Sequence, residues 1–316
     1  MSERRPVLLL VNPVAGGKLG SGPDLADDPE LLTPEALAAA LRERGLEVEL
    51  HELAEDDDAA DLAVAADDRD MDVVVAGGDG TVGAVAAALC GRDATLGILA
   101  RGSFNNVARG AGVPLELDPA LDAIGAGHAA RIDAGIARVG DREERFFEAA
   151  GVGLDAEGFG AVEAGERTNA LAMVVRAWRA LRRRRSPMRI SLDGRTYHTG
   201  APAVTISNGP YHGFGFALAP EADPQDGLLD VAIFAGMRRI DVLVHFVRVA
   251  RHRPVREPRM IRRRATEVRV EGPRRQHPVH VDGRSVGSTP ATFRVDPGAL
   301  RLFRPAASVG GGEPDR

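Results

Sequence analysis

The chain has a single cysteine, and no apolar run in it reaches the roughly 18 residues that a membrane-spanning helix needs. One cysteine, Cys90, excludes an intramolecular disulfide, which is typical of a reducing compartment. The polar N-terminus leads into a short apolar run that reads as a strand and not as a targeting segment. We therefore expect a cytoplasmic protein without a transmembrane helix.

Aromatic residues make up only 4% of the sequence. This argues against single-stranded nucleic acid as a partner, because such sites combine basic with stacking aromatic side chains. The formal net charge of −6 hides an asymmetry, because acidic runs such as 55–58 lie in the first half and arginine clusters at 182–185 and 262–264 lie in the second. We expect no nucleic acid and a peripheral contact with anionic lipid at the inner face of the membrane.

Lysine is almost absent as well, because Lys18 is the only lysine among 40 lysine and arginine residues. It ends a turn that follows the apolar run 7–11 and reads Asn12-Pro13-Val14-Ala15-Gly16-Gly17-Lys18. A compact ammonium on a flexible stem suits a phosphate, and the glycines leave backbone N–H groups open to an anion. The alternative is a surface lysine without a role.

A second turn follows the β-branched run 72–76 and reads Gly77-Gly78-Asp79-Gly80-Thr81. Its glycines permit positive φ and a close approach of an anion to the backbone. The apolar stretch 82–89 predicts a helix whose N-terminus adds partial positive charge at the same place. We expect Asp79 to face Mg²⁺ or a reacting phosphate, and the alternative is a tight strand-to-helix turn without a ligand.

A third turn follows the apolar run 96–99, reads Gly102-Ser103-Phe104-Asn105-Asn106, and offers a hydroxyl and two amides that suit a nucleotide. Predicted strands near 7–11, 46–51, 72–76 and 95–99 alternate with predicted helices near 34–45, 58–67, 80–90 and 104–111. This alternation is typical of a parallel sheet covered on both faces. Ligands of such sheets collect at the carboxyl ends of the strands, where all three turns lie.

From about residue 130 the sequence changes to short alternating segments, which include a predicted hairpin with strands at 188–192 and 195–198 around Asp193-Gly194. Two amphipathic basic helices are predicted in this half, at 168–185 and 238–252. Such helices bind anionic membrane surfaces, or alternatively pack their apolar stripe on their own domain.

Taken in order, the three turns resemble those of the diacylglycerol kinase catalytic-domain family, which includes bacterial lipid kinases and sphingosine kinases and is more distantly similar to NAD kinase. Further blocks extend the resemblance over roughly 6–304, at 151–156, 207–215, 219–230 and 279–283. The resemblance implies an α/β fold of two domains: an N-terminal nucleotide-binding domain with a parallel sheet at 1–130, and a C-terminal β-sandwich for the lipid substrate at 131–297. It also implies that a final strand near 298–305 returns to the first domain, and we expect a disordered tail at 306–316.

The resemblance also implies site residues. ATP would be held by the three turns, through Asn12, Pro13, Gly16, Gly17, Lys18, Gly77, Gly78, Asp79, Gly80, Thr81, Gly102, Ser103 and Asn105. The catalytic residues would be Asp79, on the phosphate and metal side, and Asp282, as the proton acceptor. Asp155 would anchor the substrate, with an N-cap or turn aspartate as the alternative. Asp223, Asp226 and the carbonyl of Leu228 would bind Mg²⁺, with an Asx-turn as the alternative.

Three positions depart from the family pattern. Arg284 stands where relatives usually have a glutamate, so Asp282 would be the one base of its block, because a guanidinium cannot accept a proton. Ala84 follows a turn after which many relatives carry an Asn-Glu pair, and Asn106 stands where Asp or His is frequent.

The function that we expect is an ATP- and Mg²⁺-dependent lipid kinase that phosphorylates the hydroxyl of a diacylglycerol-like or sphingoid lipid at the membrane surface. Two alternatives stay open at this point: a non-catalytic nucleotide- or lipid-binding relative, and a soluble-substrate kinase of the NAD kinase type.

Overall fold

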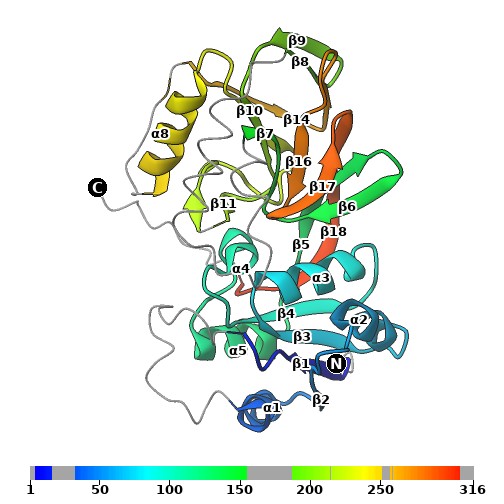
Figure 1. The fold of residues 1–316 in the computed structure, drawn as a ribbon. Helices are drawn as coiled ribbons and strands as arrows, with labels where there is room; N and C mark the ends of the chain where they lie inside the picture. Colours follow the sequence, from blue (N-terminus) through cyan, green and yellow to red (C-terminus); the bar gives the residue numbers. More distant parts are fainter. Residues whose placement is uncertain are drawn as a thin grey trace. The chain divides into compact units, whose positions relative to one another are not determined.

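The computed structural model describes residues 4–15, 33–154, 187–213, 215–250, 257 and 259–306. The chain divides into two compact units (Figure 1). Unit 1 comprises 1–103, 112–130 and 301–316, and unit 2 comprises 104–111 and 131–300. The predicted helix at 168–185, together with Gly16, Gly17, Lys18 and Asp155, lies outside the described residues.

The sheet of unit 1 is parallel and runs in the order β2-β1-β3-β4. Its strands are β1 (Val7–Val11), β2 (Val48–Glu52), β3 (Asp72–Gly77) and β4 (Thr95–Ala100). The end of β18 (Ala291–Phe303) adds to β4 in parallel through Arg301 and Leu302. Every residue of β1, β3 and β4 is buried, as a parallel sheet covered on both faces requires. The returning final strand is therefore present, and it is longer than predicted.

Two pairs of helices cover this sheet. Figure 1 shows α1 (Pro34–Glu43) on one face, and α2 (Ala59–Asp67) and α3 (Asp79–Leu89) on the other. Helix α5 (Leu117–Ala126) packs on α1 and β4. The helices predicted near 34–45, 58–67 and 80–90 are confirmed, whereas α5 was missed.

Two antiparallel sheets pack face to face in unit 2. One has the order β14-β13-β10-β7-β16-β17. Its strands are β7 (Ala149–Gly153), β10 (Ala203–Ser207), β13 (Leu229–Ile233), β14 (Ile261–Ala265), β16 (Pro278–Val281) and β17 (Arg284–Ser288). The other contains β5 (Ala129–Val139), β6 (Arg142–Phe146), β8 (Met188–Leu192), β9 (Arg195–Thr199), β15 (Glu267–Glu271) and most of β18. One hydrophobic core, which includes Phe146, Ile206 and Phe293, joins the two sheets.

Smaller elements complete unit 2: α4 (Asn106–Gly110), the short strands β11 (Tyr211–His212) and β12 (Phe216–Ala217), and α8 (Arg239–Ala250). The predicted hairpin is confirmed as β8 and β9, and its turn residues Asp193 and Gly194 have φ of 45° and 83°. Positive φ at both central positions is the requirement of a type I′ turn, which explains the Asp-Gly pair. The helix predicted at 238–252 is confirmed as α8. No helix among the described residues is both long and apolar enough to cross a membrane.

Gly97 and Gly83 provide a matched test of the packing in unit 1. A Cβ on Gly97 would lie 2.8 Å from a methyl carbon of Val74 and 3.0 Å from Ile124, whereas a Cβ on Gly83 of α3 would meet nothing within 4 Å. We expect Gly97→Ala to lower the free energy of unfolding by about 1–3 kcal/mol through overpacking. Gly83→Ala should raise it by up to about 1 kcal/mol, because alanine favours the helix. Urea denaturation of both variants measures this, and equal stabilities would contradict the described packing of β4.

Candidate functional site

The loops that follow β3 and β4 touch through their backbones. The amide of Arg101 donates to the carbonyl of Gly77 at 2.9 Å, and a Cβ on Gly78 would lie 3.1 Å from the Cα of Gly102. A side chain at position 78 would therefore separate the two loops. The structure brings the second and third turns of the sequence together at the carboxyl end of the sheet of unit 1.

The reason given above for the glycines at 77, 78 and 80 needs correction, because none of them has positive φ, and Gly78 lies at −94°. Close packing accounts for Gly78. Gly80 is exposed, with nothing within 4 Å of a Cβ placed on it. Helix α3 begins at Asp79, and its N-cap residue, Gly78, has no side chain that could cap it. The backbone N–H groups at a helix N-terminus can bind an anion such as phosphate.

The first turn is tied to the same helix end by Asn12. Its Nδ2 donates to Oγ1 of Thr81 at 2.8 Å, and its Oδ1 accepts from the amide of Val14 at 3.0 Å. Pro13 is exposed beside it, and Asp79 is half-buried in the first turn of α3. Residues from all three predicted loops of unit 1 thus surround one helix N-terminus.

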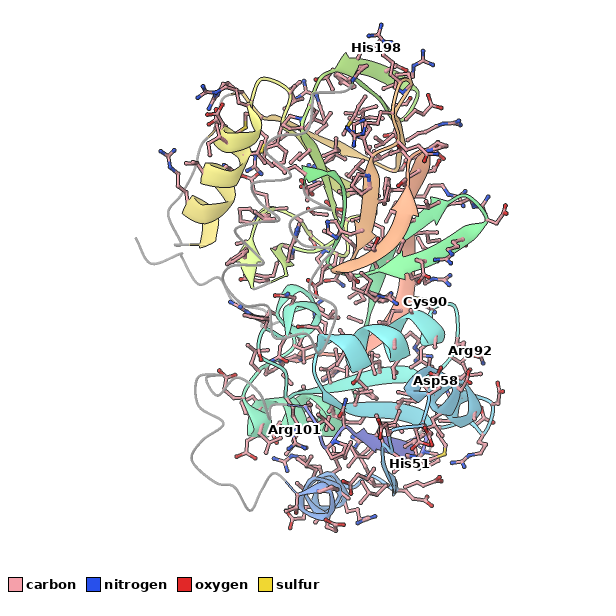
Figure 2. All side chains as sticks on the ribbon, in the orientation of Figure 1. His51, Asp58, Cys90, Arg92, Arg101 and His198 are labelled. Carbon is pink, nitrogen blue, oxygen red and sulfur yellow. The ribbon has the colours of Figure 1, made fainter. Side chains whose placement is uncertain are left out.

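Arg101 was missed in the sequence analysis. Its side chain is half-buried directly after β4, next to Gly102 (Figure 2). Burial lowers the pKa of Arg101, and no carboxylate among the described residues opposes this shift. A partly desolvated guanidinium is suited to a phosphate ligand. The sequence did contain a signal for Arg101, because this charged residue comes shortly after the apolar run 96–99.

The third turn continues into unit 2. Ser103, the last residue of unit 1 before it, is exposed. Asn105 has φ of 51°, a left-handed conformation that asparagine tolerates better than most residues, and α4 starts at Asn106. The side chain of Asn106 is buried, whereas Ser103, three residues earlier in the same turn, is exposed.

In unit 2, Asp282 lies in the turn between β16 and β17 with φ of 43°. Its carboxylate accepts hydrogen bonds from the amides of Phe147, Glu148 and Ala149 at 3.0, 3.1 and 3.0 Å. Burial raises the pKa of Asp282 to about 6, although these amides and the charge of Arg284 act in the opposite direction. A buried carboxylate that titrates near neutrality is suited to accept a proton.

Glu148 also was not identified from the sequence. It is 7% exposed, and its Oε2 accepts from Nδ2 of Asn106 and from the amide of Gly213, each at 3.0 Å. The signal was present, because Glu148 is the only charged residue in the run 146–153 of apolar and small residues. Three of the motif blocks described above supply partners of the segment 147–149: the third turn and the blocks at 207–215 and 279–283.

Family models match both units. A model of the diacylglycerol kinase catalytic domain matches residues 6–137, and a model of the YegS C-terminal NAD kinase β-sandwich-like domain matches residues 149–304. The chain belongs to the diacylglycerol kinase catalytic-domain family. The predicted family and the predicted two-domain α/β and β-sandwich fold class are therefore confirmed.

Individual family members span most of the chain. A protein of Cronobacter sakazakii named "Probable lipid kinase YegS-like" is 32% identical over 278 residues, which cover 84% of this chain and 89% of that one. The diacylglycerol kinase of Mycobacterium tuberculosis is 30% identical over 278 residues, which cover 84% and 88%. A solved structure of a diacylglycerol kinase from Bacillus anthracis covers 98% of this chain and 100% of its own at a TM-score of 0.72 and 22% identity, which shows a shared fold.

Arg284, the departure from the family pattern beside Asp282, points away into solvent. Its side chain is 67% exposed and lies 3.6 Å from the carboxylate of Glu144. The guanidinium therefore has a partner of its own and does not form an ion pair with Asp282 among the described contacts.

The residues predicted to bind structural Mg²⁺ in this family member form a turn instead. Oδ1 of Asp223 accepts from the amide of Gln225, and Oδ1 of Asp226 accepts from the amide of Leu228, each at 3.0 Å. The other carboxylate oxygen of Asp226 accepts from Arg264 at 2.9 Å. This arrangement is the Asx-turn alternative, and a guanidinium already stands where a cation would be. Mg²⁺ binding by Asp223, Asp226 and the carbonyl of Leu228 stays a prediction.

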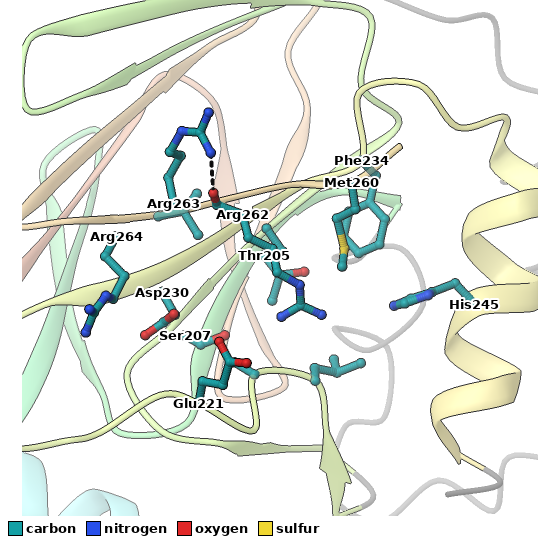
Figure 3. Close-up of a pocket in the computed structure, with 14 residues that line it drawn as sticks. Thr205, Ser207, Glu221, Asp230, Phe234, His245, Met260, Arg262, Arg263 and Arg264 are labelled. Atoms are coloured by element: carbon teal, nitrogen blue, oxygen red, sulfur yellow. Dashed lines mark hydrogen bonds between the residues drawn. The ribbon is translucent and has the colours of Figure 1, made fainter. Parts of the chain in front are cut away.

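One pocket of about 300 Å³ lies in unit 2, on the face of the sheet formed by β10, β13 and β14 (Figure 3). Its floor carries the small polar side chains of Thr205 and Ser207, and Phe234 and Met260 form an apolar side. The lining also includes two arginines of β14 and two carboxylates, namely Arg262, Arg264, Glu221 and Asp230. Burial raises the pKa of Asp230. The lining combines apolar and hydrogen-bonding groups, as a site for an amphipathic molecule requires.

Replacement of Arg101 tests the nucleotide side of the site. We expect Arg101→Ala to weaken ATP binding roughly 10- to 100-fold, the loss typical of one hydrogen bond to a charged group. Arg101→Lys should keep part of the affinity, because the charge remains but the planar fork is lost. Arg69→Ala, which removes an exposed arginine paired with Glu49 in the same unit, is the matched control. Titration calorimetry with a non-hydrolysable ATP analogue gives the affinities, and equal values for the Arg101 and Arg69 variants would exclude this role.

Proposed function

We propose that the chain is an ATP-dependent lipid kinase that transfers the γ-phosphoryl group to the hydroxyl of a diacylglycerol-like or sphingoid lipid. The observation that carries the proposal is the Asp282 carboxyl group, which three amides hold in place and whose pKa burial raises to about 6. General base catalysis is most effective when the pKa of the base lies near the working pH. The relatives named as lipid kinases and as a diacylglycerol kinase support the choice of acceptor.

Each unit supplies one part of this chemistry. In unit 1, the N-terminus of α3, with Arg101 beside it, binds the phosphates of ATP. In unit 2, Asp282 takes the proton of the attacking hydroxyl. Phosphoryl transfer needs positioning and charge neutralisation more than covalent help, and these groups provide both. Mg²⁺ bound to the phosphates would neutralise charge, and Asp79 is the carboxylate placed to hold it, because Mg²⁺ is commonly bound by one or two carboxylates together with substrate phosphates.

The mixed lining of the pocket on β10, β13 and β14 supports an amphipathic acceptor. Ser207 offers a hydroxyl to a polar head, and Phe234 and Met260 offer an apolar wall to a chain. Helix α8 adds a second feature, because Ile240 and Val244, one turn apart, are 43% and 41% exposed. Exposed apolar side chains next to arginine on one helix support a peripheral contact with an anionic membrane.

Labelled ATP with a panel of lipids, followed by chromatography of the lipid product, tests the kinase. We expect Asp282→Asn to lower turnover by about 10²–10⁴-fold, the usual contribution of a general base, while ATP binding stays intact. Arg284→Glu is the companion variant and should leave the enzyme active. Label in no lipid with either wild type or Arg284→Glu, together with normal ATP binding, would favour a non-catalytic binding protein. Label only in a soluble acceptor would favour the NAD kinase type.

The pH dependence of turnover provides a separate check on Asp282. Because its pKa is raised to about 6, the carboxylate is protonated and unable to act as a base below that pH. Wild-type kcat should therefore fall as the pH decreases through about 6 and stay level above it. The residual activity of Asp282→Asn should lack this acid limb. A profile that is flat between pH 5 and 8 in the wild type would rule out Asp282 as the titrating base.

Membrane contact is tested with the double variant Ile240→Ser/Val244→Ser. We expect weaker sedimentation with vesicles that contain anionic lipid, because about 0.8 kcal/mol is lost for each CH₂ group no longer buried. The matched control is Val14→Ser, which replaces another exposed valine, in unit 1. Binding that equals wild type in the double variant would remove α8 from the membrane contact.

A further inference from the structure

Asn12, directly after β1, uses most of its hydrogen-bonding capacity within unit 1. Its amide donates to the carbonyl of Ala76 on β3 at 2.9 Å, and its carbonyl accepts from the amide of Ala15 at 3.2 Å. Its Oδ1 accepts from the amide of Val14 at 3.0 Å, and its Nδ2 donates to Oγ1 of Thr81 at 2.8 Å. Asn12 is therefore better placed to shape the turn around a nucleotide than to hold the nucleotide itself.

The oxygen and nitrogen of the Asn12 side chain cannot be exchanged. The backbone N–H of Val14 is only a donor, so the side-chain atom that faces it must be the oxygen. The nitrogen of the same amide then faces Thr81, and this nitrogen is only a donor as well. The hydrogen bond between Asn12 and Thr81 therefore has a fixed direction, from the amide to the hydroxyl oxygen.

This direction determines how the hydroxyl of Thr81 can be used. Its oxygen accepts from Asn12, and its own proton has no acceptor among the described residues. Thr81 is the third residue of α3 and is half-buried, so the hydroxyl lies in the first turn of the helix. Thr81 is thus left with a donor at the helix N-terminus where the phosphates of ATP are proposed to bind.

A phosphate distinguishes between the two ways in which a hydroxyl can be presented. Phosphate oxygens accept hydrogen bonds and carry negative charge, so they bind an O–H and are repelled by an oxygen lone pair. A threonine side chain in a helix has two common rotamers, and the hydrogen bond from Asn12 favours one of them. Gly77 leaves room for that side chain, since a Cβ on Gly77 would lie 3.2 Å from the Cβ of Thr81.

We propose that Asn12 is a positioning residue of the nucleotide site: it acts through Thr81, whose hydroxyl it orients to donate a hydrogen bond to a phosphate oxygen of ATP. This inference rests on the proposed function, because it needs the phosphates at the N-terminus of α3. It deepens that function by separating the residue that contacts the phosphate, Thr81, from the residue that sets the direction of the contact, Asn12.

The test reverses the hydrogen bond between Asn12 and Thr81 in the full-length protein. Asn12→Asp keeps the shape and the acceptor for the amide of Val14, but the new carboxylate takes the hydroxyl proton of Thr81 as its own hydrogen bond. We expect it to weaken binding of a non-hydrolysable ATP analogue about 100-fold in titration calorimetry, and Thr81→Val to weaken it about 10-fold. Thr81→Ser keeps the hydroxyl and should bind the analogue nearly as wild type does.

The carboxylate of Asn12→Asp also adds negative charge, and two controls measure that effect. Val14→Asp places a carboxylate in the same turn, on a residue that is 69% exposed. In Asn12→Asp/Thr81→Val the hydroxyl is absent, so only the charge acts. We expect the loss from Asn12→Asp to be about tenfold smaller in the Thr81→Val background than in wild type, and close to that of Val14→Asp. Adenosine, which has no phosphate, should bind equally to wild type, Asn12→Asp and Thr81→Val.

The outcomes separate this inference from the proposed function. A wild type that binds the analogue, with additive losses from Asn12→Asp and Thr81→Val or equal losses for adenosine, would overturn the role of Asn12 and leave the kinase function standing. A wild type that binds no ATP analogue would overturn the proposed function and this inference with it. If Asn12→Asp fails to fold, as judged by thermal denaturation, the same cycle with Asn12→Ala decides, because loss of the orienting donor should also matter less when the hydroxyl is absent.

Discussion

The clamp between Asp282 and three consecutive amides is the interaction on which the rest of unit 2 depends. The carboxylate holds the segment 147–149 just before it enters β7, and the amide of Asp282 returns a hydrogen bond to the carbonyl of Ala149 at 2.9 Å. β7 lies between β10 and β16 in its sheet, so the clamp fixes where that sheet begins. The left-handed φ of 43° at Asp282 is unfavourable by itself, and the three hydrogen bonds offset it.

The same clamp explains how one carboxyl group can be held rigidly by hydrogen bonds and still have a raised pKa. An aspartate with three amide donors and an exposed environment would have a low pKa and would be a weak base. Burial outweighs those donors here, so the group is held rigidly and still titrates near neutrality. Arg284 opposes this effect only in part, because it is exposed and lies beside Glu144. Arginine at this position therefore leaves the pKa of Asp282 raised.

Much of the fold followed from the sequence, because apolar runs and glycine turns are local signals. The parallel strands of unit 1, the helices between them and the Asp193-Gly194 hairpin were predictable from periodicity and turn chemistry. Helix α5 was not, since Pro119 and Gly125 interrupt its pattern. The glycines at 77 and 78 were correctly placed in a strand-to-helix turn but for a wrong reason. Gly78 contacts the loop at Gly102, which is distant in sequence and leaves no local trace, whereas a Cβ on Gly77 would lie 3.2 Å from Thr81 of the same turn.

The candidate site was predictable only where it consists of turns. Asn12, Thr81 and Gly102 lie in turns with recognisable composition, and the structure places them at one end of one sheet. Arg101 and Glu148 stand out only when burial is known, because a single charge next to apolar residues has no periodic signature. The choice between a metal site and an Asx-turn at Asp223 and Asp226 depended on Arg264, whose strand pairs with β13 across the sheet.

Three carboxylates of unit 2, those of Asp133, Glu148 and Asp282, each accept hydrogen bonds from segments that lie far apart in the sequence. Asp133 accepts from the amides of Gly227 and Gly298 at 2.8 and 2.7 Å, and Asp282 accepts from three amides. Each joins backbone segments far apart in sequence that no strand pairing satisfies, and a carboxylate, with two acceptor oxygens, can do so where a hydroxyl cannot. Glu148 likewise bridges separate segments, because its Oε2 accepts from the Nδ2 of Asn106 and from the amide of Gly213.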